Sequence, residues 1–294
     1  MRIAVTGRNG QLARSLQERA AADPAISLVC LGRPELDLSR PESIAQALAA
    51  CDADLVVNAA AYTEVDRAES DADAAFAVNA TGAGAVAGAA ADLCVPVIQI
   101  STDYVFGGNE TAPYTETSRT NPMSVYGTTK LAGEAAVAAA NPKHLIIRTA
   151  WVYSPFGKNF VKTMLRLAGE RDSLRVVDDQ TGNPTSALDL ADAVLVTARA
   201  ALQPGFDDWG IYNISGSGST SWAGFAAHVL DESARAGGAS ALIEPIPGSE
   251  FVTAAQRPTN SRLDCTKAEQ ILGYRSPEWR QSCSLVVNRL RAEN

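Results

Sequence analysis

Residues 5–13 read VTGRNGQLA and continue the predicted strand RIAVTG, which begins at the second residue of the chain. Gly7 and Gly10 therefore lie between a predicted strand and a predicted helix. Glycine at this place lets the backbone turn tightly and approach a pyrophosphate, and free N–H groups at a helix start favour negative charge. Ala13 replaces the third glycine of the usual fingerprint and is still small. Ordinary turns also contain such glycines, but their position after the first strand favours a dinucleotide site.

The rest of the chain repeats this alternation of strand and helix. Apolar runs rich in Ile, Val and Leu recur, namely RIAVTG, ISLVCLG, ADLVVNAAA, VPVIQIS, HLIIRTAWVY and LRVVDDQ. Alanine-rich stretches with helical spacing separate them. Continuous apolar strands that alternate with helices are typical of a parallel sheet covered on both faces. The predicted fold class is α/β, a doubly wound, Rossmann-like parallel sheet.

The alternation of strand and helix patterns becomes less regular after about residue 153, where Gly, Pro and Ser become frequent. We predict a dinucleotide-binding domain over residues 1–153, with a returning segment near 174–215. Residues 154–294 are predicted to form mainly a smaller, partly discontinuous substrate-binding lobe. The strand pattern IYNISG, residues 211–216, is expected to return to the main sheet.

Composition narrows the class of protein and its partners. The 294 residues are 46% hydrophobic and 20% charged, enough to bury a large core. A formal net charge of -8 and a pI near 4.9 argue against nucleic-acid or anionic-membrane partners. Five widely spaced cysteines predict reduced thiols, and no apolar run reaches the ~18 residues of a membrane span. We expect a cytoplasmic protein without an export signal.

The end of the second predicted strand bears on which nicotinamide cofactor binds. NAD-specific enzymes usually place an acidic residue there, against the ribose 2′-hydroxyl. This chain has Gly32 and Arg33, and Arg8 lies in the first turn. Two cations favour a 2′-phosphate, so NADPH is expected, with NADH possible. The alternative is that Arg33 is a solvated loop residue, and Asp37 is available on the adenine side.

The segment YGTTK places Tyr126 four residues before Lys130 at the start of a predicted helix. On a helix these side chains leave from one face. The strand before them ends in Ser101, Thr102 and Asp103, at the carboxyl edge of a parallel sheet, where ligands bind in such folds. A surface tyrosine beside an extended lysine remains the alternative.

The chemistry of a ketone reduction suits these residue types. A phenol titrates near ~10 in water, and a nearby ammonium is expected to lower the pKa of Tyr126 toward the range of a general acid. The Thr102 hydroxyl can donate a hydrogen bond to the substrate oxygen as charge develops on it. The nicotinamide supplies the hydride.

The motifs GRNGQL, NAAAYTEVD, STDYVF and YGTTK occur in the order found in the extended short-chain dehydrogenase/reductase family, which the chain resembles. Within it, the blocks VVNAAAYTEVDRAES, SVYGTTKLAGE, VVDDQTGNPTS and RPTNSRLD are similar to those of the dTDP-4-dehydrorhamnose reductases. The resemblance covers most of the chain.

The resemblance implies a role for several residues. Tyr126 would donate the proton to the C4 oxygen of the keto sugar, Lys130 would hold the nicotinamide ribose, and Thr102 would be the catalytic hydroxyl. Asp103, Trp151 and Arg257 would contact the substrate beside Thr102 and Tyr126. The expected cofactor-binding residues are Gly7, Gly10, Gln11, Leu12, Arg33, Asp37, Leu38, Ala59, Ala61, Tyr62, Thr63, Ile100, Tyr126 and Lys130.

Several assignments have structural alternatives. Trp151 can fill the seam between the two lobes, and Asn58 and Asn79 can bind backbone or water alone. Arg257 and Arg262 both suit the substrate diphosphate, because a guanidinium forks onto phosphate oxygens, but either can instead form a surface salt bridge.

Other residues are given no functional role. His144 and His228 are interpreted as structural. Some family members use an acidic residue of the first helix as a metal ligand, whereas Arg14 and Ser15 stand here, so no metal is expected. A homodimer is possible.

The activity implied is NADPH-dependent reduction of the C4 ketone of dTDP-4-dehydro-L-rhamnose to dTDP-L-rhamnose. The sequence alone leaves the nucleotide base and the exact deoxysugar open. One alternative is a nucleotide-sugar epimerase or dehydratase, which recycles a tightly held NAD⁺. Another is the non-catalytic regulatory subunit of methionine adenosyltransferase, which acts by binding a partner enzyme.

Overall fold

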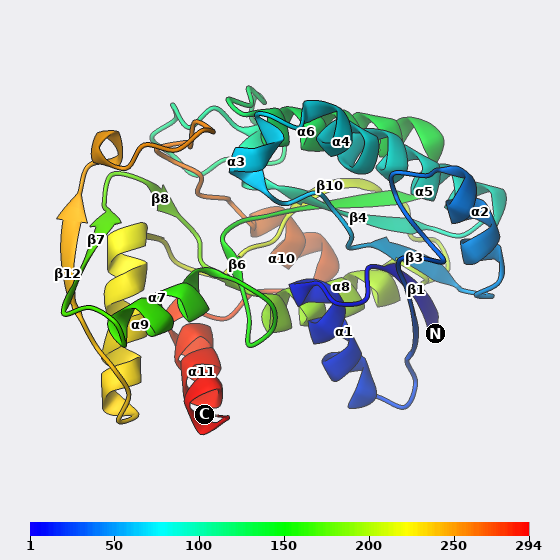
Figure 1. Ribbon diagram of the computed structural model, residues 1–294. Helices are drawn as coiled ribbons and strands as arrows, with labels where there is room; N and C mark the ends of the chain where they lie inside the picture. The colour runs from blue at the N-terminus through cyan, green and yellow to red at the C-terminus, as the bar shows by residue number, and fades with distance from the viewer. Residues whose placement is uncertain (294) are drawn as a thin grey trace.

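Six parallel strands form the central sheet of the computed structural model, which describes residues 1–293 (Figure 1). Their order is β10-β5-β4-β3-β1-β2, and every neighbouring pair is parallel. The strands are β1 (Arg2–Thr6), β2 (Ser27–Leu31), β3 (Leu55–Asn58), β4 (Val97–Thr102), β5 (His144–Thr149) and β10 (Gly210–Asn213). The predicted doubly wound parallel sheet is confirmed.

The strand order determines where a ligand can bind. β1 pairs with β2 on one side and with β3 on the other. The chain therefore reverses its winding direction between β1 and β3, and loops leaving the carboxyl ends of these strands diverge there. Such a crevice is the usual ligand site of doubly wound sheets.

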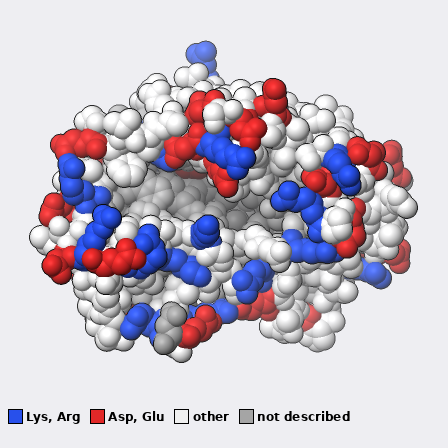
Figure 2. Space-filling view, in the orientation of Figure 1, with Lys and Arg blue, Asp and Glu red and all other residues white. Residues whose placement is uncertain are grey.

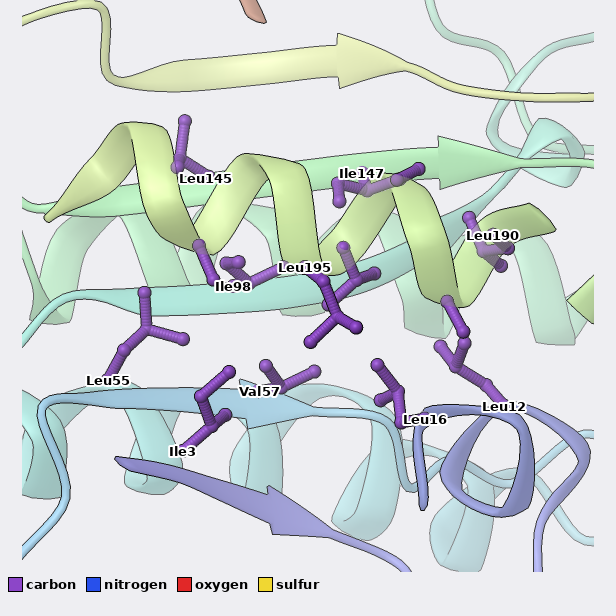
Figure 3. Packing of buried hydrophobic residues seen from close by; sticks show 14 of the residues in the cluster. Ile3, Leu12, Leu16, Leu55, Val57, Ile98, Leu145, Ile147, Leu190 and Leu195 are labelled. Carbon is purple, nitrogen blue, oxygen red and sulfur yellow. The ribbon is translucent and has the colours of Figure 1, made fainter. Parts of the chain in front are cut away.

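One face of the sheet is covered by α1 (Gln11–Ala21) and α8 (Ala187–Ala201), and α10 (Thr266–Leu272) packs beside α8. Figure 3 shows how their apolar side chains meet those of the strands. Leu12 and Leu16 of α1, and Leu190 and Leu195 of α8, point toward the buried side chains Ile3, Leu55, Val57, Ile98, Leu145 and Ile147.

The other face is covered by helices that follow β2, β3 and β4 (Figure 1). They are α2 (Glu42–Ala49), α3 (Val65–Ala68), α4 (Ala72–Phe76), the π-helical turn η1 (Ala77–Gly82), α5 (Ala83–Asp92) and α6 (Val125–Ala140). The continuous helical stretch Ala72–Asp92 is long and apolar enough to span a membrane by length and composition. Here α5 packs between α2 and α6, so its apolar side chains belong to the core of the domain.

The smaller lobe is built from short strand pairs and three helices, at the left of Figure 1. The pairs are β7 (Ser173–Val177) with β12 (Leu242–Ile246), β6 (Val152–Tyr153) with β9 (Thr185–Ser186), and β8 (Thr181–Gly182) with β11 (Thr220–Ser221). The helices are α7 (Phe160–Ala168), α9 (Trp222–Arg235) and α11 (Trp279–Ala292). Tyr153, Phe225 and Trp279 are fully buried in the core of this lobe.

The chain crosses between the two parts more than once. β7 lies in the lobe, whereas α8 and β10 lie on the main sheet. β10 pairs in parallel with β5, so the strand expected at IYNISG does return to the sheet. The domain limits near residue 153 and over 174–215 stay predictions.

Candidate active site

The helix α6 carries Tyr126 and Lys130 and is seated very close to its neighbours. Its N-cap is Ser124, whose hydroxyl accepts a hydrogen bond from the Gly127 N–H at 3.1 Å. A Cβ on Gly127 would collide with the Tyr104 carbonyl oxygen, and one on Gly133 would collide with the Asn79 carbonyl oxygen. Glycine at these two positions lets α6 approach the segment after β4 and the π-helical turn η1.

Lys130 is buried, with 4% of its surface exposed. Its ammonium donates a 2.6 Å hydrogen bond to the carbonyl oxygen of Ile100 in β4. Burial lowers the pKa of Lys130 to about 8, and the Glu134 carboxylate opposes this fall. Lys130 is therefore held against β4, and its protonation state is sensitive to burial and to nearby charges.

Thr102 ends β4, Asp103 follows it directly, and both residues are buried. The Thr102 hydroxyl donates to Asp103 Oδ1 at 2.8 Å and accepts from the Tyr104 N–H at 3.2 Å. Asp103 Oδ2 is buried, and no donor among residues 1–293 meets the geometric criteria for a hydrogen bond to it. Ser261 lies close enough to lower the pKa of Asp103. Burial outweighs these effects and raises the pKa of Asp103 to about 6.

Tyr126 lies beside these groups. The Thr102 hydroxyl lies close enough to its phenol to affect the pKa, and the Tyr104 ring meets the Tyr126 ring edge-on, with centroids 5.6 Å apart. Burial raises the pKa of Tyr126 above its ordinary value, and Asp103 raises it further, whereas Thr102 lowers it. The expected lowering by Lys130 is therefore wrong for this structure, because desolvation is the largest effect on the phenol.

A buried ion pair lies behind the lysine. Glu134, one turn after Lys130, receives two hydrogen bonds from Arg148 of β5, at 2.9 and 2.7 Å. The Ser101 hydroxyl donates to the same carboxylate. All three polar side chains are almost fully buried, so this network fixes α6 to β4 and β5.

The first turn has the geometry that a phosphate group needs. Gly7 has φ of 96°, which favours glycine, and its N–H donates to the Leu31 carbonyl oxygen. Gly10 is the N-cap of α1, and a Cβ there would meet open space. The amide groups at the start of α1 are thus approachable and carry the positive end of the helix dipole.

The two residues after Gly10 use their side chains elsewhere. Gln11 Oε1 accepts from Ser154 at 2.8 Å and from Asn159 at 3.1 Å, and its Nε2 donates to the Val152 carbonyl oxygen at 3.4 Å. Leu12 is buried in the core. Only their backbone amides remain for a cofactor, while the Gln11 side chain joins the turn to the lobe.

The two cations expected near a 2′-phosphate differ in their surroundings. Arg8 pairs with Glu35 at 3.0 Å, whereas Arg33 is exposed and has no ion-pair partner among the described residues. Asp37 accepts from Ser39, which is the largest cause of its lowered pKa. Leu38 is buried, and its carbonyl lies against Gly82.

The segment after β3 contains Ala59, Ala61, Tyr62 and Thr63. Asn79 holds it in place, since its Oδ1 accepts from the Tyr62 N–H at 2.9 Å and its Nδ2 donates to the Tyr62 carbonyl oxygen at 3.0 Å. Asn58 instead donates to Gln99 at 2.7 Å and accepts from Thr6. Both asparagines thus have protein partners, and Asn79 also reaches α6 through Thr129.

On the side of the lobe, Trp151 follows β5 with φ of 46° and stacks on Trp222 with ring centroids 3.6 Å apart. Arg257 pairs with Asp66 of α3, with the two nitrogen–oxygen distances 2.8 and 3.2 Å. It also contacts the Tyr104 phenol, whose pKa burial raises to about 12.

Arg262 is directed away from this group. Its Nε donates to Asn260 at 2.9 Å, and it also donates to the Thr111 carbonyl oxygen. Of the two arginines considered for the substrate diphosphate, Arg257 alone contacts a neighbour of Thr102 and Tyr126.

Figure 2 shows a hollow in the face of the molecule, between the main sheet and the lobe. Acidic and basic side chains lie together above it, and Lys and Arg side chains gather below it. Among residues 1–293, no group of three or more His, Cys, Asp or Glu side chains is arranged to hold a metal ion.

Four residues of the site were not predicted as site residues. Tyr104 lies inside the quoted STDYVF block, so that motif could have indicated it. The sequence gives no local signal for Trp222 or Asp66, because their importance depends on contacts with elements distant in the chain. Glu134 has a weak signal, its helical spacing of four residues from Lys130.

A doubly wound sheet with an open glycine turn, and with Tyr126, Lys130 and Thr102 at its carboxyl edge, defines an oxidoreductase of the extended short-chain dehydrogenase/reductase class. Residues 1–292 match the model of the RmlD substrate binding domain. The chain belongs to this family.

Named relatives support this assignment. The dTDP-4-dehydrorhamnose reductase of Sinorhizobium fredii is 50% identical over 98% of this chain and 97% of its own. The reductase of that name from Clostridium acetobutylicum has a crystal structure with a TM-score of 0.91 and 36% identity, covering 99% of this chain and 100% of that one. The one from Bacillus anthracis, solved in complex with NADP, has a TM-score of 0.89 and 33% identity, covering 100% and 99%.

Proposed function

We propose that this chain reduces the C4 ketone of dTDP-4-dehydro-L-rhamnose to dTDP-L-rhamnose and prefers NADPH. The names of its relatives support the reaction. The observation that carries the proposal is the contact of Tyr126 with Thr102 at the end of β4, with Lys130 seated behind them on Ile100. A proton donor, a second hydroxyl and a cation thus meet at the ligand edge of the sheet.

Tyr126 donates the proton from its phenol to the C4 oxygen as the ketone is reduced. Its raised pKa keeps the phenol protonated at neutral pH, which is the state that a donor needs. The Thr102 hydroxyl donates to Asp103 Oδ1 at 2.8 Å and lies close enough to the Tyr126 phenol to affect its pKa, so the two hydroxyls can orient the substrate oxygen. Lys130 binds the nicotinamide ribose and supplies positive charge as the phenolate forms.

The cofactor side of the crevice fits a dinucleotide. The amides of Gly10, Gln11 and Leu12 meet the pyrophosphate at the start of α1. Arg33 is free to meet a 2′-phosphate, and the segment with Ala59, Ala61, Tyr62 and Thr63 runs along the cofactor. NADPH, when bound, supplies the hydride. The NADP complex of the Bacillus anthracis relative favours this cofactor.

The substrate side is assigned to Asp103, Trp151 and Arg257. Asp103 Oδ2 is buried and accepts no hydrogen bond that meets the geometric criteria within residues 1–293. It therefore suits a sugar hydroxyl, because an unpaired buried acceptor gains most from a new donor. Arg257 suits the diphosphate, since its guanidinium forks onto two oxygens.

The test is a cofactor-oxidation assay with purified chain. The keto sugar is supplied as its dTDP or UDP derivative, with NADPH and NADH in turn, and loss of nicotinamide absorbance is compared with sugar product formed. We expect one nicotinamide oxidised per sugar reduced, with the highest kcat/KM for NADPH and the dTDP sugar. An epimerase or dehydratase would convert sugar without net oxidation, which would overturn the proposal.

Tyr126→Phe removes the donor proton and preserves the ring. Turnover is expected to fall by about 10²- to 10⁴-fold, the usual contribution of a general acid, while NADPH affinity stays near wild type. Tyr274→Phe is the matched control, because its phenol donates to the Asp189 carbonyl oxygen of α8 on the opposite face of the sheet. Equal turnover of Tyr126→Phe and wild type would remove Tyr126 from this role.

Two further expectations concern the setting of the enzyme. A cytoplasmic location is expected from the named relatives and is checked by fractionation of cells that express the chain. A homodimer remains a prediction, which light scattering on the purified protein would decide.

A further inference from the structure

Trp151 has a backbone conformation that a bulky residue rarely adopts. Its φ of 46° lies in the left-handed region, which favours glycine, two residues beyond the end of β5. Such strain persists only where the surrounding structure fixes it, and it is concentrated at functional sites. The question is which groups hold the Trp151 indole.

Two neighbours from different elements hold it. Trp222, the first residue of α9, stacks on the indole with ring centroids 3.6 Å apart and planes 6° apart. Gly182 of β8 lies against the pyrrole side, because a Cβ there would collide with Trp151 Cε2 and come within 2.6 Å of Nε1. The ring is thus packed by a parallel aromatic surface and by a residue without a side chain.

Trp222 is itself firmly placed. Ser221 caps α9 by accepting from the Gly224 N–H at 3.0 Å, and its hydroxyl also donates to Asp178. Phe160 of α7 contacts the Trp222 ring with centroids 4.7 Å apart. A rigid Trp222 can therefore dictate the orientation of Trp151.

We propose that Trp222 is a positioning residue, which together with Gly182 fixes the Trp151 indole in the orientation that receives the sugar of the nucleotide substrate. This rests on the proposed function, in which Trp151 contacts that sugar. Because Trp222 covers one face of the indole, the sugar meets the rest of the ring, and the ring needs no reordering when the sugar binds. Trp222 acts through Trp151, so its loss weakens sugar binding more than it slows the chemical step.

The test compares Trp222→Leu, Trp222→Phe and Gly182→Ala, with Trp209→Phe as control. Trp209 contacts Phe206 edge-on beside the core under the sheet and has no part in the stack. Near-ultraviolet circular dichroism reports the stacked indole pair. Titrations measure Kd for dTDP-L-rhamnose, for dTDP and for NADPH, and steady-state kinetics measure KM and kcat for the keto sugar.

We expect Trp222→Leu to lose the signal of the stacked pair and to raise KM and the Kd for dTDP-L-rhamnose about tenfold, an aromatic contact's usual contribution. The Kd values for dTDP and NADPH stay within about twofold, and kcat falls less than KM rises. Trp222→Phe retains most of the affinity because a ring still supports the indole. Gly182→Ala gives the same sugar-specific loss from the other side, and it tests the proposal if Trp222→Leu does not fold.

An unchanged Kd for dTDP-L-rhamnose in a folded Trp222→Leu that has lost the stacking signal would overturn the proposal. So would an equal loss of dTDP affinity, because that indicates general damage to the lobe. If the proposed function were wrong, wild type itself would fail to bind dTDP-L-rhamnose better than dTDP, an outcome that no variant is needed to see.

Discussion

Lys130 shows how burial controls a single charge in this site. Within residues 1–293 its ammonium has one hydrogen-bond acceptor, the Ile100 carbonyl oxygen, and desolvation lowers its pKa to about 8. The role proposed for it requires the charged form. Its working range therefore ends close to physiological pH.

The pH dependence of Lys130 gives opposite signs for activity and stability. Activity is expected to fall as pH rises through about 8, as the ammonium loses its proton. The folded pKa lies below the ordinary value of 10.5, so the unfolded chain binds more protons between these values. The free energy of unfolding is then expected to rise over this window, by up to about 3 kcal/mol. Parallel pH profiles of kcat/KM and of urea unfolding check this.

Glu134→Gln sharpens this test, since the Glu134 carboxylate raises the pKa of Lys130. The alkaline fall in activity should move to lower pH. The change also leaves Arg148 buried without its partner, at a cost of about 3–5 kcal/mol, so folding is verified first. Glu170→Gln, in an exposed pair with Arg166, is the control. A profile that is lowered uniformly and not displaced would contradict the charge effect.

At this scale the sequence indicates residue types better than their surroundings. The spacing of Tyr126 and Lys130 predicts that both lie on α6, and the end of β4 predicts Thr102. The predicted direction of the Tyr126 pKa shift is wrong, because the spacing of two residues carries no information on their burial. Asp66 and Trp222 were missed because they come to Arg257 and Trp151 from distant segments.

Among the helices and strands, the close packing of α6 against its neighbours is the feature that positions Tyr126 and Lys130. Alanine and glycine are frequent over residues 82–91, and the structure places Gly84 against Ala136 of α6, where a Cβ would come within 3.0 Å. The π-helical turn η1 before α5 was not predicted, since a single inserted residue barely changes apolar periodicity.

Gly133→Ala is expected to displace α6. The new Cβ would collide with the Asn79 carbonyl oxygen, which is backbone and cannot rotate away. Overpacking of this kind costs about 1–3 kcal/mol, and kcat should fall because Tyr126 and Lys130 move with the helix. Urea unfolding and steady-state kinetics measure the two effects.

Gly88→Ala in α5 is the matched control. Its Cβ would meet open space, so helix propensity alone acts and stability should rise by about 0.5–1 kcal/mol. If both variants changed stability equally and in one direction, close approach would not explain Gly133.

In the whole molecule, side-chain contacts of Asp66 and Gln11 help to join the main sheet to the lobe, in addition to the Glu18–Arg289 pair of α1 and α11. Asp66 of α3 pairs with Arg257, and the same carboxylate accepts from the Ala255 N–H at 3.1 Å. Gln11 joins the first turn to Ser154 and Asn159. The strand order of the main sheet follows from alternating strands and helices. The β7–β12 pair does not, because its partners are about 70 residues apart and nothing local specifies them.

Arg257 is expected to exchange Asp66 for the substrate diphosphate. Arg257→Ala should raise KM for the nucleotide sugar about tenfold or more, as for a lost charge-assisted hydrogen bond, with kcat changed less. Asp66→Asn should leave KM unchanged or lower it, because the guanidinium is released. Arg262→Ala is the control, since Arg262 contacts Asn260 and Thr111. A larger KM effect of Arg262→Ala would reverse the assignment.

The Gln11 side chain has a consequence for the sequence of events in turnover. It touches Val152, the neighbour of Trp151, while its backbone amide lies at the proposed pyrophosphate site. Binding of the nicotinamide cofactor should therefore favour binding of the sugar beside Trp151. Thermodynamic linkage makes this influence mutual. We expect compulsory-order kinetics with the nicotinamide arriving first and departing last, visible as competitive product inhibition by NADP⁺ against NADPH alone. Gln11→Ala should relax that order toward random addition.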